Sequence, residues 1–191
     1  MPLHDTVDSV FLARHGRTAL NAEGRLRGLS NPPLDDVGQD EARRLGVELA
    51  RYSPTIVITS PLTRAVSTGR AIATQARIPA VIDERLNDRD YGPWTGHPRD
   101  EVEQRFGSVD DAPGVEPRAR LAHRALTAFT ALTNEYSDGP LVLVSHDAFN
   151  SALLSGLDPE LAGVSQRTGC YNQLSRNNGQ WRVDFYNRLP V

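Results

Sequence analysis

Four basic side chains that suit the binding of an anion each follow an apolar stretch of this 191-residue chain. They are Arg14, His15, Arg64 and His146. Arg14 and His15 follow the run Val10–Ala13, and His146 follows the run Leu141–Val144 with one serine between them. Arg64 comes shortly after Thr55–Thr59, which is β-branched throughout. Because ligands of open α/β sheets bind beyond the carboxyl ends of the strands, we expect these four side chains to meet there.

This set of side chains suits the transfer of a phosphoryl group. An arginine fork pairs with two phosphate oxygens and offsets the charge of the group in transfer. A neutral imidazole that attacks phosphorus divides hydrolysis into transfer to nitrogen and transfer from nitrogen to water. The leaving oxygen needs a proton, and the charge-rich loop Asp83–Gly96 offers carboxylic acids for that role. The residue types therefore predict phosphoryl chemistry.

The spacing of apolar residues predicts the elements that hold this set in place. Strands are predicted at 10–13, 55–59, 80–82, 141–144, 171–175 and 181–186. Helices are predicted from a cap at 34–36 to about 51, and at about 62–76, 98–106, 117–136 and 148–155. A long functional loop is predicted to follow the first strand, and an active-site loop to cover 83–96. The turn Asn177–Gly179 is expected to join the last two strands.

The order of these elements predicts an α/β fold. Strands that alternate with helices indicate a doubly wound, mostly parallel sheet with helices on both faces. The last two strands predict an antiparallel edge. The length favours a single domain over residues 1–191, with a small cap inserted at about 97–117.

Composition excludes several classes of protein. The net charge is −3, the 21 residues that make up the lysine and arginine content are all arginines, and no basic block or nucleic-acid-binding motif is present. A mean hydropathy of −0.43 and the lack of a run of about 18 apolar residues argue against a membrane span. The first ten residues show no secretory signal, and the lone Cys170 fits a reducing compartment, so we expect a cytoplasmic protein. His4 is expected in a frayed end.

The chain resembles the histidine phosphatase superfamily, which includes the cofactor-dependent phosphoglycerate mutases. The resemblance spans nearly the whole chain and is carried by several segments in the family's order. These segments are LARHGRT, GRLRGLSNPPLDDVG, TSPLTRAVST, RLNDRDYGPWTG and VLVSH. The resemblance implies that His15 is the phosphorylated nucleophile and that Arg14 and Arg64 bind phosphate. It further implies that Asn21 binds phosphate and that His146 is both catalytic and phosphate-binding.

Two positions depart from the family's pattern. The family's proton donor is usually a glutamate, and Asp88 stands at that position with a side chain one methylene shorter. Asp88 is preferred as the donor, with Asp90 and Glu84 as alternatives; all three acids have neighbouring arginines with which they would otherwise pair. Asp147 replaces the common glycine after the late histidine, where it would orient His146, select the substrate or cap a helix. The family's Gly-Glu-Ser segment is reduced to GVEP.

These features predict a phosphatase that hydrolyses a small phosphomonoester without a metal or other cofactor, through a phosphohistidine on His15. A phosphoglycerate-mutase-type phosphotransferase is the nearest alternative, although family mutases carry a longer insertion than the segment between Gly96 and Pro117. A non-catalytic phospho-ligand binding protein and a metal-dependent hydrolase built on His146 and Asp147 are alternatives of other classes, but no second metal motif is present. Arg17, Arg27 and Asp147 are candidates for the substrate side. We expect a monomer or homodimer.

Overall fold

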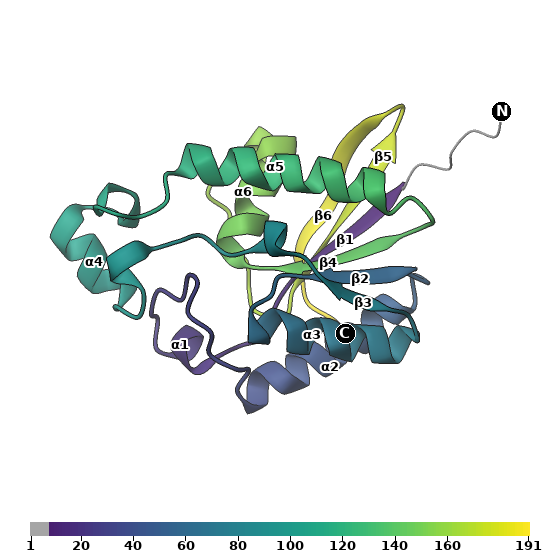
Figure 1. Ribbon diagram of the computed structural model, residues 1–191, viewed down its shortest axis with the longest axis horizontal. Helices are drawn as coiled ribbons and strands as arrows, with labels where there is room; N and C mark the ends of the chain where they lie inside the picture. Colours follow the sequence, from purple (N-terminus) through teal and green to yellow (C-terminus); the bar gives the residue numbers. More distant parts are fainter. Residues whose placement is uncertain (1–7) are drawn as a thin grey trace.

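A computed structural model describes residues 8–191, in which a six-stranded sheet lies between two layers of helices (Figure 1). His4 and the first part of the segment searched for a secretory signal lie outside the described residues. The strands are β1 (Ser9–Arg14), β2 (Ile56–Thr59), β3 (Ala80–Ile82), β4 (Leu141–Ser145), β5 (Tyr171–Asn177) and β6 (Gln180–Arg188). The α-helices are α1 (Ala19–Ala22), α2 (Asp36–Ala50), α3 (Thr63–Ala76), α4 (Arg99–Phe106), α5 (Arg118–Glu135) and α6 (Asp147–Leu157). Single 3-10 turns form η1 (Glu84–Leu86), η2 (Gly92–Trp94), η3 (Val109–Asp111) and η4 (Pro159–Leu161).

The strand order β3-β2-β4-β1-β5-β6 confirms the predicted α/β sheet. The first four strands in this order pair in parallel, whereas β5 pairs antiparallel with both β1 and β6. Arg14 pairs with Ser145, and Thr59 pairs with Val144, so β1, β2 and β4 end at the same level of the sheet. The residues that follow these strand ends are His15, Ser60 and His146. The register thus brings the predicted chemistry to one edge of the sheet.

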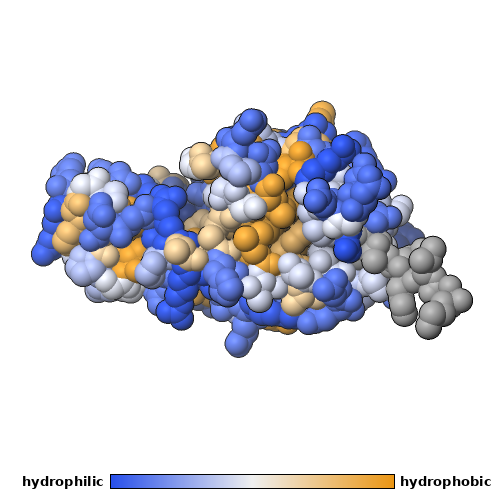
Figure 2. Space-filling view, turned by 90° about the horizontal axis from the view of Figure 1, so that it is seen from above, coloured by the Kyte–Doolittle hydropathy of each residue, from blue (hydrophilic) through white to orange (hydrophobic). Residues whose placement is uncertain are grey.

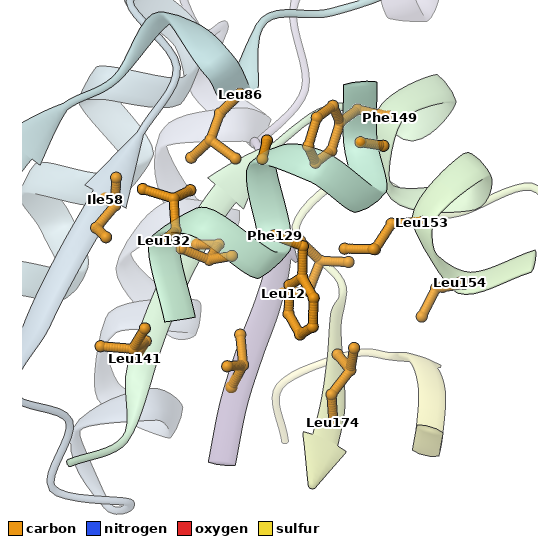
Figure 3. Close-up of a cluster of buried hydrophobic side chains, with 14 of the residues drawn as sticks. Leu12, Ile58, Leu86, Phe129, Leu132, Leu141, Phe149, Leu153, Leu154 and Leu174 are labelled. Atoms are coloured by element: carbon orange, nitrogen blue, oxygen red, sulfur yellow. The ribbon is translucent and has the colours of Figure 1, made fainter. Parts of the chain in front are cut away.

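Two apolar clusters hold the helices to the two faces of the sheet. Successive residues of β1 point to opposite faces, so Leu12 joins the cluster under α5 and α6, and Phe11 joins the cluster under α2 and α3. Figure 3 shows the first cluster, in which Phe129 of α5 and Phe149 of α6 are buried near the strands. Each such side chain contributes about 1.5–3 kcal/mol through its burial. The core therefore fixes the strand ends on which the site is built.

Two glycines allow α2 to pack against the turn after β1. A Cβ on Gly16 would lie 2.3 Å from the carbonyl oxygen of Gly38, and a Cβ on Gly38 would lie 2.0 Å from that of Arg17. Asp35 caps α2 by accepting a hydrogen bond from the Gly38 N–H at 2.8 Å, and its own N–H donates to the Arg17 carbonyl. The beginning of α2 therefore holds the backbone around His15 in place.

A small cap lies at one end of the molecule, where α4 and η3 fold within the predicted segment 97–117 (Figure 1). A separate apolar cluster joins it to the body. Its buried members are Leu26, Tyr91, Val102, Val109, Ala112 and Val115. Seen from the α5 side in Figure 2, the surface is largely hydrophilic, with an apolar patch near the middle of the body. None of the helices formed by residues 8–191 is long and apolar enough to cross a membrane.

The predicted loop after β1 contains a helix that the sequence analysis missed. Thr18 and Asn21 form a capping box around the single turn α1, in which each side chain bonds the other's backbone. The turn before β6 follows the prediction, because Asn178 and Gly179 both have positive φ angles of 50° and 78°. Such a turn matches the twist of an antiparallel pair of strands.

Candidate active site

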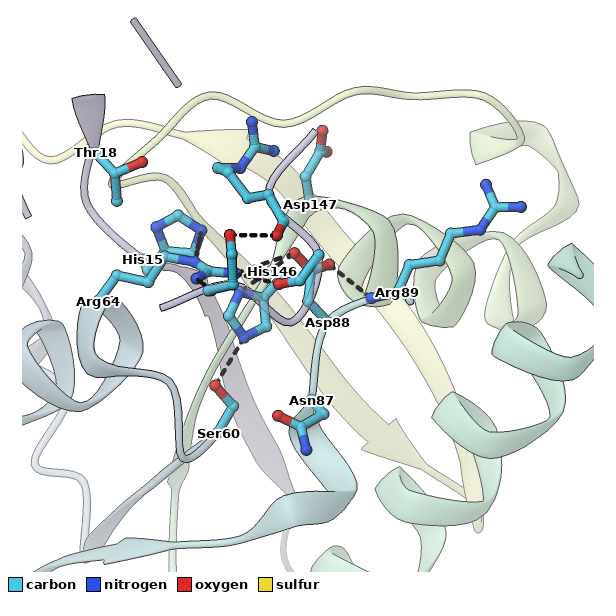
Figure 4. A network of polar contacts seen from close by, with 12 residues as sticks. His15, Thr18, Ser60, Arg64, Asn87, Asp88, Arg89, His146 and Asp147 are labelled. Atoms are coloured by element: carbon cyan, nitrogen blue, oxygen red, sulfur yellow. Dashed lines mark hydrogen bonds and ion pairs between the residues drawn. The ribbon is translucent and has the colours of Figure 1, made fainter. Parts of the chain in front are cut away.

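The side chains of His15, Arg64 and His146 lie together beyond the strand ends, fully buried (Figure 4). The two imidazole rings are 5.1 Å apart between their centroids. The Arg64 Nε donates a hydrogen bond to His15 Nε2 at 3.2 Å. The structure thus brings three of the four predicted basic side chains into direct contact or close approach.

The hydrogen bonds of His15 fix which ring nitrogen is free to react. Its Nδ1 lies 2.6 Å from the carbonyl oxygen of Gly16, so this nitrogen carries the proton and donates. Nε2 then keeps its lone pair, in agreement with the hydrogen bond that it accepts from Arg64. Burial, followed by the charges of His146, Arg64 and Arg14, holds the pKa of His15 well below 6.5. At neutral pH this imidazole is therefore uncharged, and the lone pair of its Nε2 faces Arg64.

His146 is held from β2 by a residue that the sequence analysis overlooked. Ser60 Oγ lies 2.7 Å from His146 Nε2, as Figure 4 shows. Burial and the nearby arginines, Arg64 first, lower the pKa of His146 well below 6.5. When the Ser60 hydroxyl donates to Nε2, the proton of the neutral ring lies on Nδ1, which has no hydrogen-bond partner among the described residues. His146 is then a free donor inside the site.

Arg64 is the central cation of the site. Besides His15, its guanidinium donates to the carbonyl oxygens of Ser30 at 2.7 Å and Gly28 at 2.8 Å, and to Asp88 Oδ2 at 3.2 Å. Burial lowers its pKa to about 10, so Arg64 stays charged at neutral pH. These contacts fix the plane of a group that pairs bidentately with phosphate oxygens.

Of the three acids considered as proton donor, the structure places Asp88 in the site. Its carboxyl is 4% exposed, and Oδ2 lies 3.8 Å from His146 Nδ1. Its other oxygen accepts from the backbone N–H of Arg89 at 2.8 Å. Asp90 and Glu84 line the same cavity on the α5 side as Asp88, but among the described residues only Asp88 pairs with Arg64 and approaches His146. The short side chain of Asp88 therefore reaches Arg64 and approaches His146.

The alternative in which these acids pair with neighbouring arginines is largely wrong. Arg85 pairs with Asp83 and Glu135, and the guanidinium of Arg89 pairs with Asp110 at 2.7 Å. None of these pairs involves Asp88, Asp90 or Glu84. The acid in the site pairs with Arg64 instead.

Arg14 lies beside this group, at the base of a cleft. One of its terminal nitrogens donates to the carbonyl oxygen of Gln166 and lies 3.8 Å from Asp147 Oδ2, while its buried Nε has no partner among the described residues. Asp147 is the first residue of α6, and its Oδ1 accepts from the Gln166 N–H at 2.8 Å. The residue at the N-cap position is His146, so the interpretation of Asp147 as a helix cap is wrong.

The cleft has a volume of about 630 Å³ and lies between the body and the cap. Arg14, Asn21, Arg27 and Asp147 line it, which brings four predicted site residues to one wall. The amide oxygen of Asn21 accepts from Thr18, so its NH₂ group remains free to donate. Arg17 is not part of the lining. Its Nε donates to Asp35 at 2.8 Å.

The cleft is rich in arginine, and most of its guanidinium groups have acidic partners. Arg89 and Arg118 pair with Asp110, and Arg99 pairs with Glu103. Arg27 differs: one terminal nitrogen donates to a backbone carbonyl at 3.0 Å, and its buried Nε has no partner among the described residues. Burial and the charge of Arg14 lower its pKa. The wall around Arg14 and Arg27 therefore carries positive charge suited to an anionic ligand.

Most other candidate residues lie away from the site. No group of three or more histidine, cysteine, aspartate or glutamate side chains within residues 8–191 is arranged to hold a metal ion. His97 lies on the cap with a side chain 45% exposed, and His123 is exposed on α5. Cys170 lies next to Arg14, whose backbone N–H donates to its carbonyl at 2.9 Å, and burial raises the pKa of its thiol to about 12.

Known proteins share this fold and these motifs. The profile of the histidine phosphatase superfamily (branch 1) matches residues 10–189. The uncharacterized phosphatase PhoE of Bacillus subtilis (strain 168) is 31% identical over 182 residues, which cover 94% of each chain. The 2,3-bisphosphoglycerate-dependent phosphoglycerate mutase 2 of Gloeobacter violaceus is 33% identical over 164 residues, covering 78% of this chain and 75% of that protein.

Among solved structures, a mycobacterial glucosyl-3-phosphoglycerate phosphatase in complex with VO3 has the same fold. Its TM-score is 0.83 at 23% identity, and the match covers 95% of this chain and 99% of that one. The profile match over almost the whole chain and the phosphatase relative of equal length support phosphatase activity. Together with the histidine and arginine geometry at the strand ends, they show that the chain belongs to the histidine phosphatase superfamily.

Proposed function

We propose that this protein hydrolyses a small phosphomonoester through a covalent phosphohistidine on His15, without a metal ion. The observation that supports this most is the hydrogen bond from His15 Nδ1 to the Gly16 carbonyl. It leaves Nε2 unprotonated beside Arg64, in a site that keeps the ring neutral. A nucleophile and the cation that binds the group to be attacked are thereby side by side.

In the first step, the lone pair of His15 Nε2 forms a bond to phosphorus while the bond from phosphorus to the ester oxygen breaks. Arg14 and Arg64 bind the phosphoryl oxygens, and His146 Nδ1 and the Asn21 amide donate further hydrogen bonds. Asp88, in its protonated form, gives its proton to the leaving oxygen, so that an alcohol departs. The phosphoryl group is then carried by His15.

In the second step, water replaces the alcohol. Asp88, now ionised, accepts a proton from the water as its oxygen attacks phosphorus. The bond from phosphorus to Nε2 breaks, its electron pair returns to the nitrogen, and inorganic phosphate leaves through the cleft. One water molecule is consumed and both His15 and Asp88 return to their starting states.

Hydrolysis is favoured over transfer to a second substrate by the small size of the cap. Between Gly96 and Pro117 the chain forms only the eight-residue α4 and the single turn η3. The cleft under this cap leaves room for water as well as substrate. Phosphotransfer is a second candidate function, because one relative of this chain is named as a phosphoglycerate mutase.

A screen of phosphomonoesters tests the proposal. Phosphate release is measured from sugar phosphates, phosphoglycerates, nucleotides and phosphopeptides, with His15→Ala as the matched control and with a chelator in a parallel series. We expect release from at least one small ester, no change with chelator, and no release by His15→Ala. Hydrolysis by His15→Ala above the buffer rate contradicts the proposal.

Three further results would each replace the proposal with an alternative. A mutase incubated with 3-phosphoglycerate and its bisphosphate forms more isomerised product than free phosphate. For this protein we expect more free phosphate than isomerised product. Binding of a phosphorylated ligand without any turnover across the screen identifies a non-catalytic binding protein. Loss of activity in chelator, with recovery on adding a divalent ion, identifies a metal-dependent hydrolase.

A further inference from the structure

We propose that Arg124, held by Glu116, is a positioning residue that sets the reach of the Asp88 carboxyl toward the leaving oxygen. This inference rests on the proposed function, in which Asp88 is the proton donor. Arg124 lies on α5, and neither its sequence position nor its helix connects it with the strand-end site. Its contacts make the connection, because they are made to the backbone of the segment that carries Asp88.

The Arg124 guanidinium donates hydrogen bonds to two adjacent carbonyl oxygens and to one carboxylate. One terminal nitrogen donates to the carbonyl of Asn87 at 2.8 Å, and the other donates to the carbonyl of Asp88 at 2.7 Å. Its Nε donates to Glu116 Oε1 at 2.7 Å, and the second terminal nitrogen also reaches Glu116 Oε2 at 3.0 Å. This arrangement uses the planar fork of an arginine, which a lysine does not offer.

Glu116 completes the attachment from the cap side. Its side chain is 8% exposed. Its backbone N–H donates to the carbonyl of Asp90 at 2.8 Å, and its carboxylate accepts from the Asp90 N–H at 3.3 Å. Its own carbonyl accepts from Arg89 Nε at 2.8 Å. Arg124 therefore holds the backbone of Asn87 and Asp88, and Glu116 bonds the next two residues, Arg89 and Asp90.

The opposite end of this segment is tied to the sheet. Ser145 Oγ, at the end of β4, donates to the carbonyl of Leu86 at 2.8 Å. The Arg124 guanidinium also lies over the ring of Phe149, with 5.8 Å between its carbon and the ring centroid. Phe149 is fully buried in the first turn of α6, directly beyond His146. Arg124 thus holds the Asp88 backbone at a fixed distance from the element that carries the late histidine.

The short side chain of Asp88 makes this placement matter. An aspartate carboxyl is one methylene from the backbone, so χ1 alone sets the position of its carboxyl carbon and χ2 only rotates its oxygens. Asp88 nevertheless reaches Arg64 Nη2 at 3.2 Å and approaches His146 Nδ1 at 3.8 Å. A displacement of the backbone at Asn87 and Asp88 therefore moves the carboxyl by almost the same distance. A displacement of about 1 Å at a reacting group lowers the rate by up to about 10²-fold.

The test compares esters whose leaving groups differ in their need for a proton. Wild type, Asp88→Asn, Arg124→Gln and Arg120→Gln are assayed with propyl phosphate, phenyl phosphate and p-nitrophenyl phosphate. Arg120 is the matched control, because it is exposed on the same helix and lines the same cavity on the α5 side. The readout is the ratio of kcat/KM for propyl phosphate to kcat/KM for p-nitrophenyl phosphate, which depends on the first step alone, and kcat and KM are measured for each ester.

We expect Asp88→Asn to lower the ratio by about 10²-fold or more, as for the loss of a general acid. Arg124→Gln is expected to lower it by about tenfold or more with KM nearly unchanged, since Arg124 does not line the substrate cleft. Arg120→Gln leaves the ratio at the wild-type value. The double variant Asp88→Asn with Arg124→Gln gives a ratio no lower than Asp88→Asn alone, because both changes act on one group.

Each failure has its own signature. If Arg124→Gln lowers kcat/KM equally for all three esters, or leaves the ratio unchanged, Arg124 does not position Asp88. If Asp88→Asn leaves the ratio unchanged, Asp88 is not the donor and the proposed function fails at that step. Arg124→Gln leaves the Glu116 carboxylate without its partner, and this single variant can fail to fold. In that case the double variant Arg124→Gln with Glu116→Gln, which removes both charges, is used for the same test. Thermal unfolding identifies the folded variants.

Discussion

Acidification from pH 7.0 to 5.5 is expected to cost the protein about 2–3 kcal/mol of unfolding free energy through His15 and His146 together. In the folded state, burial and neighbouring cations hold the pKa of both rings well below 6.5, whereas both titrate near 6.5 in the unfolded chain. The unfolded state therefore binds protons in this range that the folded state does not. The stabilisation is complete above the unfolded pKa and is lost as the pH falls through it, by about 1 kcal/mol for each histidine over this interval.

Urea unfolding at pH 7.0, 6.5, 6.0 and 5.5 measures this dependence. Carboxyls whose pKa is lowered in the folded state, such as those of Asp83, Asp110 and Glu116, are ionised in both states over this range and add little. His15→Asn and His146→Gln are each expected to remove about half of the pH dependence, whatever their effect on stability at pH 7.0. A wild-type stability that does not change with pH, or a full dependence in both variants, refutes the assignment of two buried neutral imidazoles.

Three substitutions test other parts of the structure. Gly38→Ala is expected to lower the unfolding free energy measured in urea by about 1–3 kcal/mol, because the new Cβ would meet the Arg17 carbonyl. Alanine otherwise favours helices, so a gain in stability would contradict that close approach. Ser60→Ala is expected to cost about 1–3 kcal/mol in the same assay, since His146 loses its hydroxyl partner, and an unchanged midpoint argues against this contact. Arg64→Lys is expected to lower kcat on nitrophenyl phosphate by about 10²-fold or more, because one ammonium does not replace the fork, and wild-type kinetics would show that Arg64 does not stabilise the transferred group.

The sequence alone predicted the sheet and the convergence of the basic residues, because both follow from local patterns. The apolar runs before Arg14 and His146 can only be central strands, and parallel strands place their carboxyl ends at one edge. The helix predicted to run from a cap at 34–36 to about 51 ends within one residue of α2, and its cap, Asp35, lies within the predicted range. Such features depend on spacing and on residue types that are visible within a few positions.

What the sequence did not reveal depends on contacts between distant segments. Ser60 was interpreted as the end of a strand, although its place directly after β2, at the same edge as His15, was a usable signal. Arg124 looked like one more charge on the outer face of a helix, and nothing near it in the chain indicates the carbonyls of Asn87 and Asp88 as its partners. Arg17 was grouped with the substrate-side arginines, but Asp35 accepts its hydrogen bond outside the cleft. Arginines are long enough that position in the chain does not determine where their charge lies.

Trapping of the covalent intermediate tests the central claim most directly. The protein is mixed with a phosphomonoester that it hydrolyses and that is labelled in its phosphoryl group. The reaction is quenched in alkali, because phosphohistidine is labile to acid, and the labelled residue is identified by mass spectrometry. The account predicts a phosphoryl adduct on His15 that forms within one turnover, decays in water at the rate of phosphate release, and is absent from His15→Ala. An adduct on another residue, or steady turnover in His15→Ala, would contradict it.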